Sequence, residues 1–264
     1  MPRYKNPIPV VDFPDKKQHV DLDENEYNFK ESVYFAFIDV LGFKKAFDDN
    51  RQTITDPTDD KFAEKFKRVF RYYFSLMNSA NFVKRGRSLC YAGQTSDSLY
   101  FYTEREDILV EFLKIYVHFS AYAMTQDVFF RGGIAKGRLF YKRNYQFYGD
   151  SVINAYMLES QISKNPIIVI DENTYNAIAV SSECNKLVDK KNERYYIKPF
   201  AYLEQKFDLD FDESSLIIRN IDEDLLKSTI EQNKIRFEYD ARNYEKYVFL
   251  LNEYQAYFKK SRVK

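Results

Sequence analysis

The chain contains few of the residues on which disulfide, soft-metal and histidine chemistry depend. Its 264 residues include 2 cysteines, 2 histidines and no tryptophan. Cys90 and Cys184 alone cannot build a disulfide framework or a cysteine-rich zinc site. Because His19 and His118 are the only histidines, the sequence also argues against acid–base or metal chemistry centred on histidine.

An excess of charge of either sign is missing as well. Lys and Arg together number 40, as do Asp and Glu, so the chain has no bulk attraction for nucleic acid or for an anionic membrane. No apolar run approaches the ~18 residues of a membrane span, and residues 1–5 do not lead into the apolar block of a signal peptide. We therefore expect a cytoplasmic protein without a nucleic-acid or membrane partner.

The composition that is present, 45% hydrophobic and 30% charged, is that of a globular protein. At ~100–200 residues per domain, the length fits one large domain or one domain with appendages. Prolines interrupt the first 30 residues, at Pro2, Pro7, Pro9 and Pro14, and predict a loosely attached arm. We predict an N-terminal arm at 1–30, a catalytic domain at 31–205 and a helical C-terminal extension at 206–264.

Between the two ends, the apolar pattern alternates between strands and helices. A near-continuous apolar run at Val33–Leu41 predicts a strand buried on both faces, and apolar residues at helical spacing from Phe62 to Met77 predict an amphipathic helix. Further strands are predicted at Ser88–Ala92, Ser98–Tyr102, Phe129–Ala135, Arg138–Tyr141 and Ile167–Ile170, and further helices at 107–125, 150–163, 173–185, 221–236 and 239–260. This order predicts an α+β protein with a ferredoxin-like, split β-α-β-β-α-β core.

Two acidic residues interrupt the apolar frame. Asp39 lies inside the first strand, where an unpaired carboxylate is costly to bury, although an Asp at a strand end can also cap the next turn. Asp97 lies where the predicted hairpin loop, residues 93–97, enters an aromatic strand, and a turn Asp is common there. In the split fold the third strand runs antiparallel beside the first, so the two carboxylates become neighbours. Paired carboxylates suit Mg²⁺ or Mn²⁺, and two such ions can stabilise an in-line phosphoryl displacement.

A basic residue and two aromatic residues complete the candidates. Arg131 opens the glycine-rich stretch Arg131–Gly137 and offers bidentate geometry to phosphate oxygens. The glycines allow a ligand to approach the backbone closely, although glycines in a strand also mark bulges. Phe43 and Tyr148 flank turns, where each can face a base or simply pack.

Four segments in this order resemble the motifs of class III nucleotidyl cyclases, most closely the pyrimidine cyclases of bacterial Pycsar antiphage systems. They are Phe37–Phe43, Ser96–Ser98, Arg131–Gly137 and Tyr145–Glu159, and the resemblance covers about residues 33–175. It implies that Asp39 and Asp97 hold two divalent cations, Mn²⁺ or Mg²⁺, with the backbone carbonyl of Ile38 as a further ligand. It also implies that Arg131 contacts the triphosphate, and that a head-to-tail homodimer shares two active sites.

The positions that read the base differ from those of purine cyclases. By the resemblance, the base-recognising Asp and Lys of adenylate cyclases align with Gln146 and Gly93. Gln146 offers both a donor and acceptors, so it can read either a uracil or a cytosine edge. The prediction that UTP is preferred over CTP comes from the resemblance to the family and not from the residues of this sequence.

The positions that hold the ribose and the transition-state charge differ as well. The Asn and Arg that the family normally presents on this helix align with Ile153 and Met157. Asn154 is displaced by one residue, which rotates its side chain by ~100° about the helix. Lys136, Arg138 or a lysine of the C-terminal extension is then the candidate source of the missing charge.

The predicted function is a pyrimidine nucleotide cyclase that converts UTP, or CTP, to the 3′,5′-cyclic mononucleotide and pyrophosphate. As the resemblance implies, the product acts on a separate effector as the signal of an antiphage defence system. Three alternatives remain open. They are a catalytically inactive nucleotide-sensing or scaffold domain, which Ile153 and Met157 favour, a purine cyclase, and a relative of polymerase palm domains that joins two nucleotides.

Overall fold

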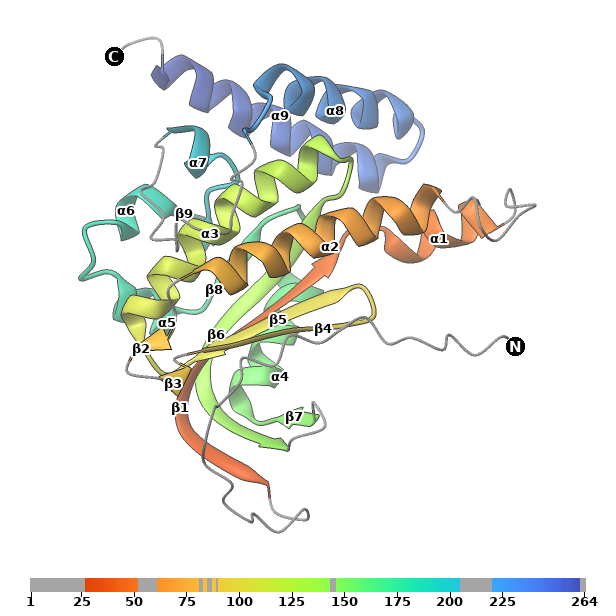
Figure 1. The fold of residues 1–264 in the computed structure, drawn as a ribbon. Helices are drawn as coiled ribbons and strands as arrows, with labels where there is room; N and C mark the ends of the chain where they lie inside the picture. Colours follow the sequence, from red (N-terminus) through yellow and green to blue (C-terminus); the bar gives the residue numbers. More distant parts are fainter. Residues whose placement is uncertain are drawn as a thin grey trace.

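One mixed sheet forms the centre of the molecule (Figure 1). The computed structural model describes residues 27–51, 61–80, 83–84, 87–88, 90–142, 146–204 and 220–261. Across the sheet the strands are β4 (Cys90–Thr95), β5 (Ser98–Thr103), β1 (Asn28–Val40), β6 (Phe130–Lys142), β8 (Ile168–Ile170), β10 (Arg194–Ile197) and β9 (Val188–Lys191). The short strand β7 (Gln146–Tyr148) pairs with the far end of β6, and β2 (Val83–Lys84) and β3 (Arg87–Ser88) form a separate hairpin.

Helices cover both faces of this sheet. Helices α2 and α3 cross the face turned to the viewer in Figure 1, α4 lies behind it, and α8 and α9 lie at one end. The bounds are α1 (Phe43–Arg51), α2 (Lys61–Ser79), α3 (Glu106–Thr125), α4 (Asp150–Met157), the π-helical turn η1 (Leu158–Ile162), α5 (Glu172–Ile178), α6 (Cys184–Leu187), α7 (Ala201–Glu204), α8 (Glu223–Arg236) and α9 (Ala241–Ser261). Among the described helices, none combines the length and the hydrophobicity of a membrane span.

Strand β1 lies at the centre and divides its side chains between the two faces. Tyr34, Ile38 and Val40 belong to the large core under α2 and α3, whereas Val33 and Phe35 pack in the smaller core under α4. Burial on both faces explains why this strand reads as an almost continuous apolar run. The same alternation turns the side chain of residue 39 to the α4 face.

The strand order confirms the predicted α+β class and its split β-α-β-β-α-β core. The chain runs through β1, α2, β4, β5, α3 and β6, and β1 lies antiparallel between β5 and β6. Strand β1 begins at Asn28, inside the segment predicted as an arm. Residues 1–26 and 205–219 lie outside the described residues, so the arm and both domain boundaries stay predictions.

Some predicted elements have different bounds in the structure, and one hairpin was not predicted. The two strands predicted on either side of Lys136 and Gly137 form one continuous strand, β6, because both residues stay paired with β1. The helix predicted at 173–185 is broken into α5 and α6. The hairpin of β9 and β10 was not predicted, because its short, charged first strand lacks an apolar run.

The glycines of β6 make room for neighbouring backbone. A Cβ atom on Gly133 would lie 2.2 Å from the carbonyl oxygen of Ala155 in α4, and one on Gly137 would lie 2.8 Å from the backbone nitrogen of Ser151. Helix α4 therefore packs directly on the backbone of β6. The expectation that these glycines admit a ligand is wrong at both positions, because α4 already fills the space.

The C-terminal helices are attached to the core through apolar and polar contacts. Their cluster includes Leu226 and Leu250, both fully buried, together with Phe129, which immediately precedes β6. Asn233 of α8 donates a hydrogen bond to Asp127 Oδ1 at 2.7 Å, so α8 is fixed to the turn between α3 and β6.

Replacing Gly133 with Ala is expected to destabilise the fold by about 1–3 kcal/mol, because the new methyl group meets the backbone of α4 and not a movable side chain. Urea unfolding followed by circular dichroism measures the loss. Gln161→Ala, at an exposed position of η1, is the control and is expected to stay within about 0.5 kcal/mol of the wild type. An unchanged midpoint for Gly133→Ala would contradict the close packing of α4 on β6.

Candidate active site

Three strands meet at the edge of the sheet where β1 ends. Asp39 lies opposite Ser98 of β5 and opposite Arg131 of β6. Asp97 immediately precedes Ser98 in the two-residue turn that joins β4 to β5. The structure therefore brings together Asp39, Asp97 and Arg131, which lie far apart in the sequence.

The Asp39 carboxylate is held between a hydroxyl group and a guanidinium group. Ser98 Oγ donates a hydrogen bond to Asp39 Oδ1 at 3.0 Å, and Arg131 Nη2 lies 3.9 Å from Asp39 Oδ2. Burial and the Asp97 carboxylate raise the pKa of Asp39, while Ser98 and Arg131 oppose the rise. The dominant effects on this group, loss of water and a like charge, both make the ionised form unfavourable.

A further acidic residue, Glu159, belongs to this cluster and was missed in the sequence. Its side chain is 3% exposed, and its Oε1 atom lies 2.7 Å from Arg131 Nη2. Burial raises the pKa of Glu159, the Arg131 charge opposes the rise, and both aspartates of the site add to it. Glu159 follows the buried Ser151 and Ala155 at intervals of four, so an acid on the inner face of a helix was the signal that could have revealed it.

Arg131 is therefore positioned by two acidic groups on different elements. Glu159 forms the shorter ion pair, from η1, and Asp39 lies on the strand beside it. Within the described residues, the buried Arg131 Nε makes no hydrogen bond. A guanidinium group anchored in this way keeps donors for an anionic group that enters beside Asp39.

The carboxylates fit the divalent cations implied by the sequence. Carboxylate oxygens are the ligands that Mg²⁺ and Mn²⁺ prefer, and a cation between Asp39 and Asp97 would remove the repulsion that raises the pKa of Asp39. In the described part of the chain, no three His, Cys, Asp or Glu side chains form a metal cluster, so the two aspartates would need oxygens from backbone, water or substrate. Ile38 lies opposite both Leu99 and Gly132 within the sheet, and its carbonyl stays a predicted ligand.

Gln146 and Tyr148 lie at the opposite end of the sheet from Asp39. Tyr148 pairs with Phe140, which pairs with Phe29, ten residues before Asp39 on the same strand and therefore roughly 30 Å from it. Gln146 Oε1 accepts a hydrogen bond from Tyr27 at 2.8 Å. Tyr148 stacks on Phe140 at a centroid distance of 4.8 Å and stays 46% exposed.

The Tyr100 side chain fills the space at Gly93, and Lys136 is directed away from Asp39. Gly93 lies in β4, not in the predicted loop, and a Cβ atom there would lie 2.2 Å from the Tyr100 hydroxyl oxygen, so Gly93 makes room for that side chain. Lys136 lies opposite Tyr34, with its Nζ atom 5.0 Å from the centre of that ring. That is the α2 and α3 face, so within one chain Lys136 does not reach Arg131.

Phe43 and Asn154 occupy two other places. Phe43 begins α1 and packs edge-on against Phe66 at 5.0 Å, so within this chain it supports the core. Asn154 is exposed on α4, beside Ile153 and Met157, which are 56% and 43% exposed. The outer face of α4 is therefore apolar at both positions where the resemblance expects polar or charged groups.

The chain is similar to solved cyclase structures at low sequence identity. The catalytic core of a rhodopsin-guanylyl cyclase with converted specificity, in complex with ATPαS, is 18% identical with a TM-score of 0.43, over 66% of this chain and 98% of that one. Two adenylate cyclases from Trypanosoma brucei in their monomeric state are 14% and 13% identical, with TM-scores of 0.46 and 0.44. They cover 69% and 64% of this chain and 96% and 89% of their own. No family model and no curated protein sequence matches the chain.

Replacing Asp97 with Asn removes a like charge beside Asp39, so it is expected to raise the free energy of unfolding of the metal-free protein by up to about 1 kcal/mol, and with it the melting temperature. Mn²⁺ is expected to raise the melting temperature of the wild type and not that of Asp97→Asn, because binding to the folded state stabilises it. Differential scanning fluorimetry in EDTA and in increasing MnCl₂ measures both effects. Asp189→Asn, at an exposed position of β9, should keep the wild-type response, and an equal Mn²⁺ response in Asp97→Asn would exclude this metal site.

Proposed function

We propose that the chain is a nucleotidyl cyclase, which converts a nucleoside triphosphate to a 3′,5′-cyclic mononucleotide and pyrophosphate. One observation carries the proposal. Asp39 and Asp97 lie side by side at the end of β1, next to Arg131, at the edge of a split β-α-β-β-α-β sheet. Two carboxylates for divalent cations and a guanidinium group for phosphate are the groups that an in-line phosphoryl displacement requires.

In the proposed reaction the ribose 3′-hydroxyl oxygen attacks the α-phosphorus. The bond between the α-phosphorus and the bridging oxygen of the β-phosphate breaks, pyrophosphate leaves with that oxygen, and the hydroxyl proton passes to solvent. Asp39 and Asp97 would hold the cations, which stabilise negative charge on attacking and leaving oxygens. Arg131, kept in place by Glu159, donates to phosphate oxygens, so positioning and electrostatics supply most of the catalysis.

The proposed enzyme acts as a head-to-tail homodimer. Asp39 and Gln146 lie at opposite ends of β1 and β6, too far apart for one nucleotide to contact both in the same chain. A second copy in reverse orientation would place its Gln146 and Tyr148 against the first chain's Asp39. Between these ends the exposed face of α4 presents Ile153 and Met157, which a partner would bury.

The proposed substrate is a pyrimidine nucleotide, UTP or CTP. The amide of Gln146 carries both a donor and acceptors, and this set matches either pyrimidine edge. The exposed Tyr148 ring beside it offers a surface on which a base can stack. The proposed role of the cyclic product, a signal to a separate effector in antiphage defence, extends the resemblance of the sequence motifs.

A catalytically inactive nucleotide-binding domain is the second candidate. It is favoured by Ile153 and Met157, because neither side chain can donate a hydrogen bond to ribose or stabilise charge on a phosphate. The proposed cyclase needs another group for that charge.

Incubating the purified protein with each of the four ribonucleoside triphosphates and Mn²⁺ is expected to give cyclic UMP or cyclic CMP, resolved by mass spectrometry. Asp39→Asn and Asp97→Asn are expected to lower the rate at least about 10³-fold, because each removes a charge that binds the cations. Asp189→Asn is the matched control. The absence of product favours the inactive domain, a cyclic purine nucleotide would overturn the pyrimidine assignment, and a dinucleotide would indicate a polymerase-like reaction.

Mixing Asp39→Asn with Gln146→Leu tests the shared site. Each variant alone is expected to be inactive or weakly active, because both of its composite sites lack a group. In a mixed dimer one of the two sites receives both wild-type residues. Random exchange of equal amounts makes about half of the dimers mixed, so it should restore about a quarter of the wild-type rate. No recovery, after native mass spectrometry confirms the mixed dimer, would place Asp39 and Gln146 in separate sites.

A further inference from the structure

A cavity of about 600 Å³ lies where the C-terminal helices meet the end of β1. One wall is the turn that follows β1, from Val40 to Phe43, and the opposite wall comes from the corner between α8 and α9. The start of α2 and the turn between α3 and β6 complete the lining. The volume lies within the roughly 300–1,000 Å³ of pockets that take small molecules and cofactors.

The cavity and the candidate active site lie on opposite faces of the sheet at the end of β1. Val40 lines the cavity and belongs to the main core under α2 and α3, as does Phe66 of α2. Asp39, the preceding residue, turns to the α4 face because side chains alternate along a strand. Among the described lining residues there is neither Asp39 nor Asp97 nor Arg131. The cavity is therefore a second place for a ligand, which shares with the first only the end of β1 and the turn after it.

Aromatic rings form one wall of this cavity. Phe237 stacks with Tyr247 at a centroid distance of 5.5 Å and an interplanar angle of 4°, and Tyr247 packs edge-on against Phe129 at 5.2 Å. All three residues line the cavity, and so does Tyr239, which is 96% exposed. Because Phe237, Tyr247 and Phe129 hold one another in place, this wall is preformed for a planar ring.

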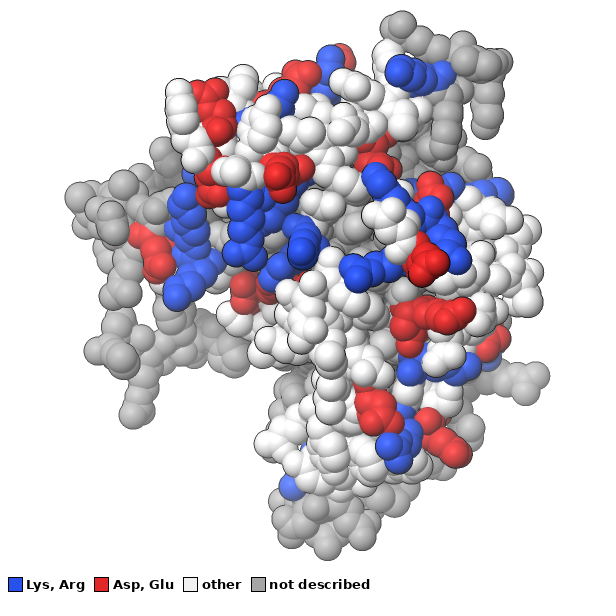
Figure 2. Space-filling model, turned by 180° about the vertical axis from the view of Figure 1, so that it is seen from behind, with Lys and Arg blue, Asp and Glu red and all other residues white. Residues whose placement is uncertain are grey.

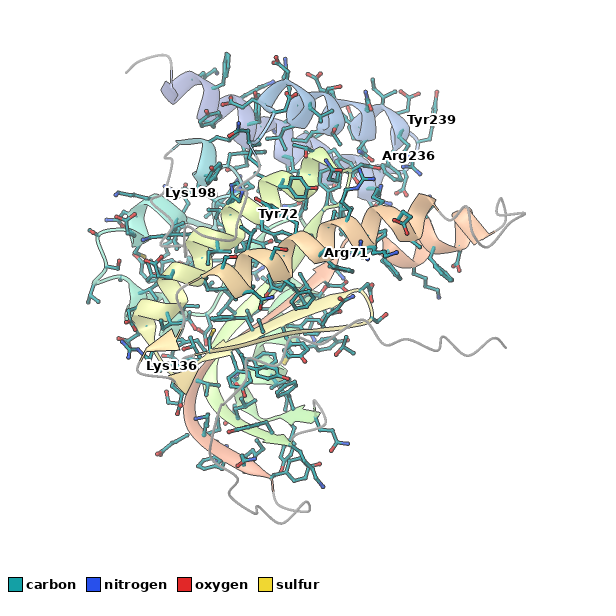
Figure 3. The ribbon with its side chains drawn as sticks, in the orientation of Figure 1. Arg71, Tyr72, Lys136, Lys198, Arg236 and Tyr239 are labelled. Atoms are coloured by element: carbon teal, nitrogen blue, oxygen red, sulfur yellow. The ribbon has the colours of Figure 1, made fainter. Side chains whose placement is uncertain are left out.

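Two cations from different helices line the cavity beside this wall. Lys45 Nζ of α1 lies 5.5 Å from the ring centre of Phe237, and the guanidinium carbon of Arg236 at the end of α8 lies 5.4 Å from it. Figure 3 shows Arg236 and Tyr239 at the corner between α8 and α9, above the end of α2. In Figure 2, Lys and Arg side chains gather on the side of the molecule where α1 lies, below the C-terminal helices.

The two carboxylates of the cavity are hydrogen-bonded to other groups. Asp127 accepts from Lys65 at 2.9 Å and from Asn233 at 2.7 Å. Asp240 accepts from the side-chain amide of Asn243 at 2.7 Å. Lys65 and Asp127 therefore neutralise each other, and Asp240 is the carboxylate that remains to balance Lys45 and Arg236.

Asp240 balances only part of that positive charge. Hydrogen bonds from Asn243 lower the pKa of Asp240, and the charge of Lys45 adds to the effect without forming an ion pair with it. Within the described part of the chain, no carboxylate forms an ion pair with Lys45 or Arg236. Both side chains are exposed and keep their N–H donors for an anion that enters the cavity.

An aromatic wall beside two cations matches a planar ring that carries a phosphate group. A phosphate monoester has about −1.5 to −2 charges at pH 7, and a guanidinium group donates to two of its oxygens at once. We infer that this cavity is a second nucleotide site, which holds the base of a nucleoside monophosphate against Phe237 and Tyr247 and its phosphate at Lys45 and Arg236. This site goes beyond the proposed function, because it needs neither the aspartates nor a divalent cation.

Isothermal titration calorimetry with adenosine 5′-monophosphate in EDTA tests this site. EDTA removes divalent cations, so a nucleotide held through Asp39 and Asp97 does not contribute. Arg236→Gln and Lys45→Gln are each expected to weaken binding about tenfold, because each removes a charged donor to phosphate. Lys227→Gln, on the exposed face of α8, is the matched control and should bind as the wild type does.

Dissecting the nucleotide tests the two halves of the site separately. Adenosine lacks the phosphate and ribose 5-phosphate lacks the base, so each is expected to bind at least about tenfold more weakly than the nucleotide. Equal binding of ribose 5-phosphate and the nucleotide would refute the role of the aromatic wall. Equal binding of adenosine would refute the role of the two cations.

Thermal unfolding in the absence of nucleotide shows that the variants are folded. Arg236→Gln and Lys45→Gln should stay within about 0.5 kcal/mol of the wild type, because both positions are exposed. No binding by the wild type, or unchanged affinity in both variants, overturns the inference. So does loss of binding in Arg131→Gln, since that result places the nucleotide at the candidate active site.

The outcome is independent of the cyclase assay. Binding that depends on Arg236 and Lys45 supports the second site even where the wild type cyclises none of the four nucleotides. Cyclisation by the wild type, without binding of the monophosphate in EDTA, refutes the second site and leaves the cyclase assignment standing.

Discussion

The site depends on the register between β1 and β5, which holds two carboxylates together against their mutual repulsion. Asp39 lies opposite Ser98, and the preceding pair, Ile38 and Leu99, is fully buried in the main core. A slip of one residue would turn Ile38 out of that core and turn Asp39 to the other face of the sheet. The apolar pairs of the centre therefore determine the position of the charges at the edge.

Strand order and the pairing of the two aspartates could be predicted because both follow from local apolar patterns and one known topology. Glu159 could not be assigned to the site, because its role depends on the direction of α4 over β6. The glycines were ambiguous for a similar reason: what fills the space at Gly133 is a carbonyl oxygen more than twenty residues away. A predicted break at Lys136 hid the alternation of β6, which places Lys136 and Arg131 on opposite faces.

The two halves of the proposed substrate site lie at opposite ends of the same pair of strands. Cation and phosphate groups lie near Asp39, whereas the base-reading candidates, Gln146 and Tyr148, lie beyond the far end of α4. At the first end two carboxylates repel each other, and at the second end an aromatic ring is partly exposed. In the proposed dimer a reversed copy brings the second end of one chain to the first end of the other, and it would cover the exposed apolar side chains of α4.

The source of positive charge at the phosphates then decides how such a dimer works. A cation on the partner's α4 would reach the substrate only after the dimer forms, and Met157 offers no such cation. Among the lysines of the C-terminal extension, Lys246 comes from the same chain as Asp39, and its neighbour Tyr247 packs on Phe129. Burial and the charges of Arg242 and Arg131 lower the pKa of Lys246, and the charge of Asp240 opposes this effect.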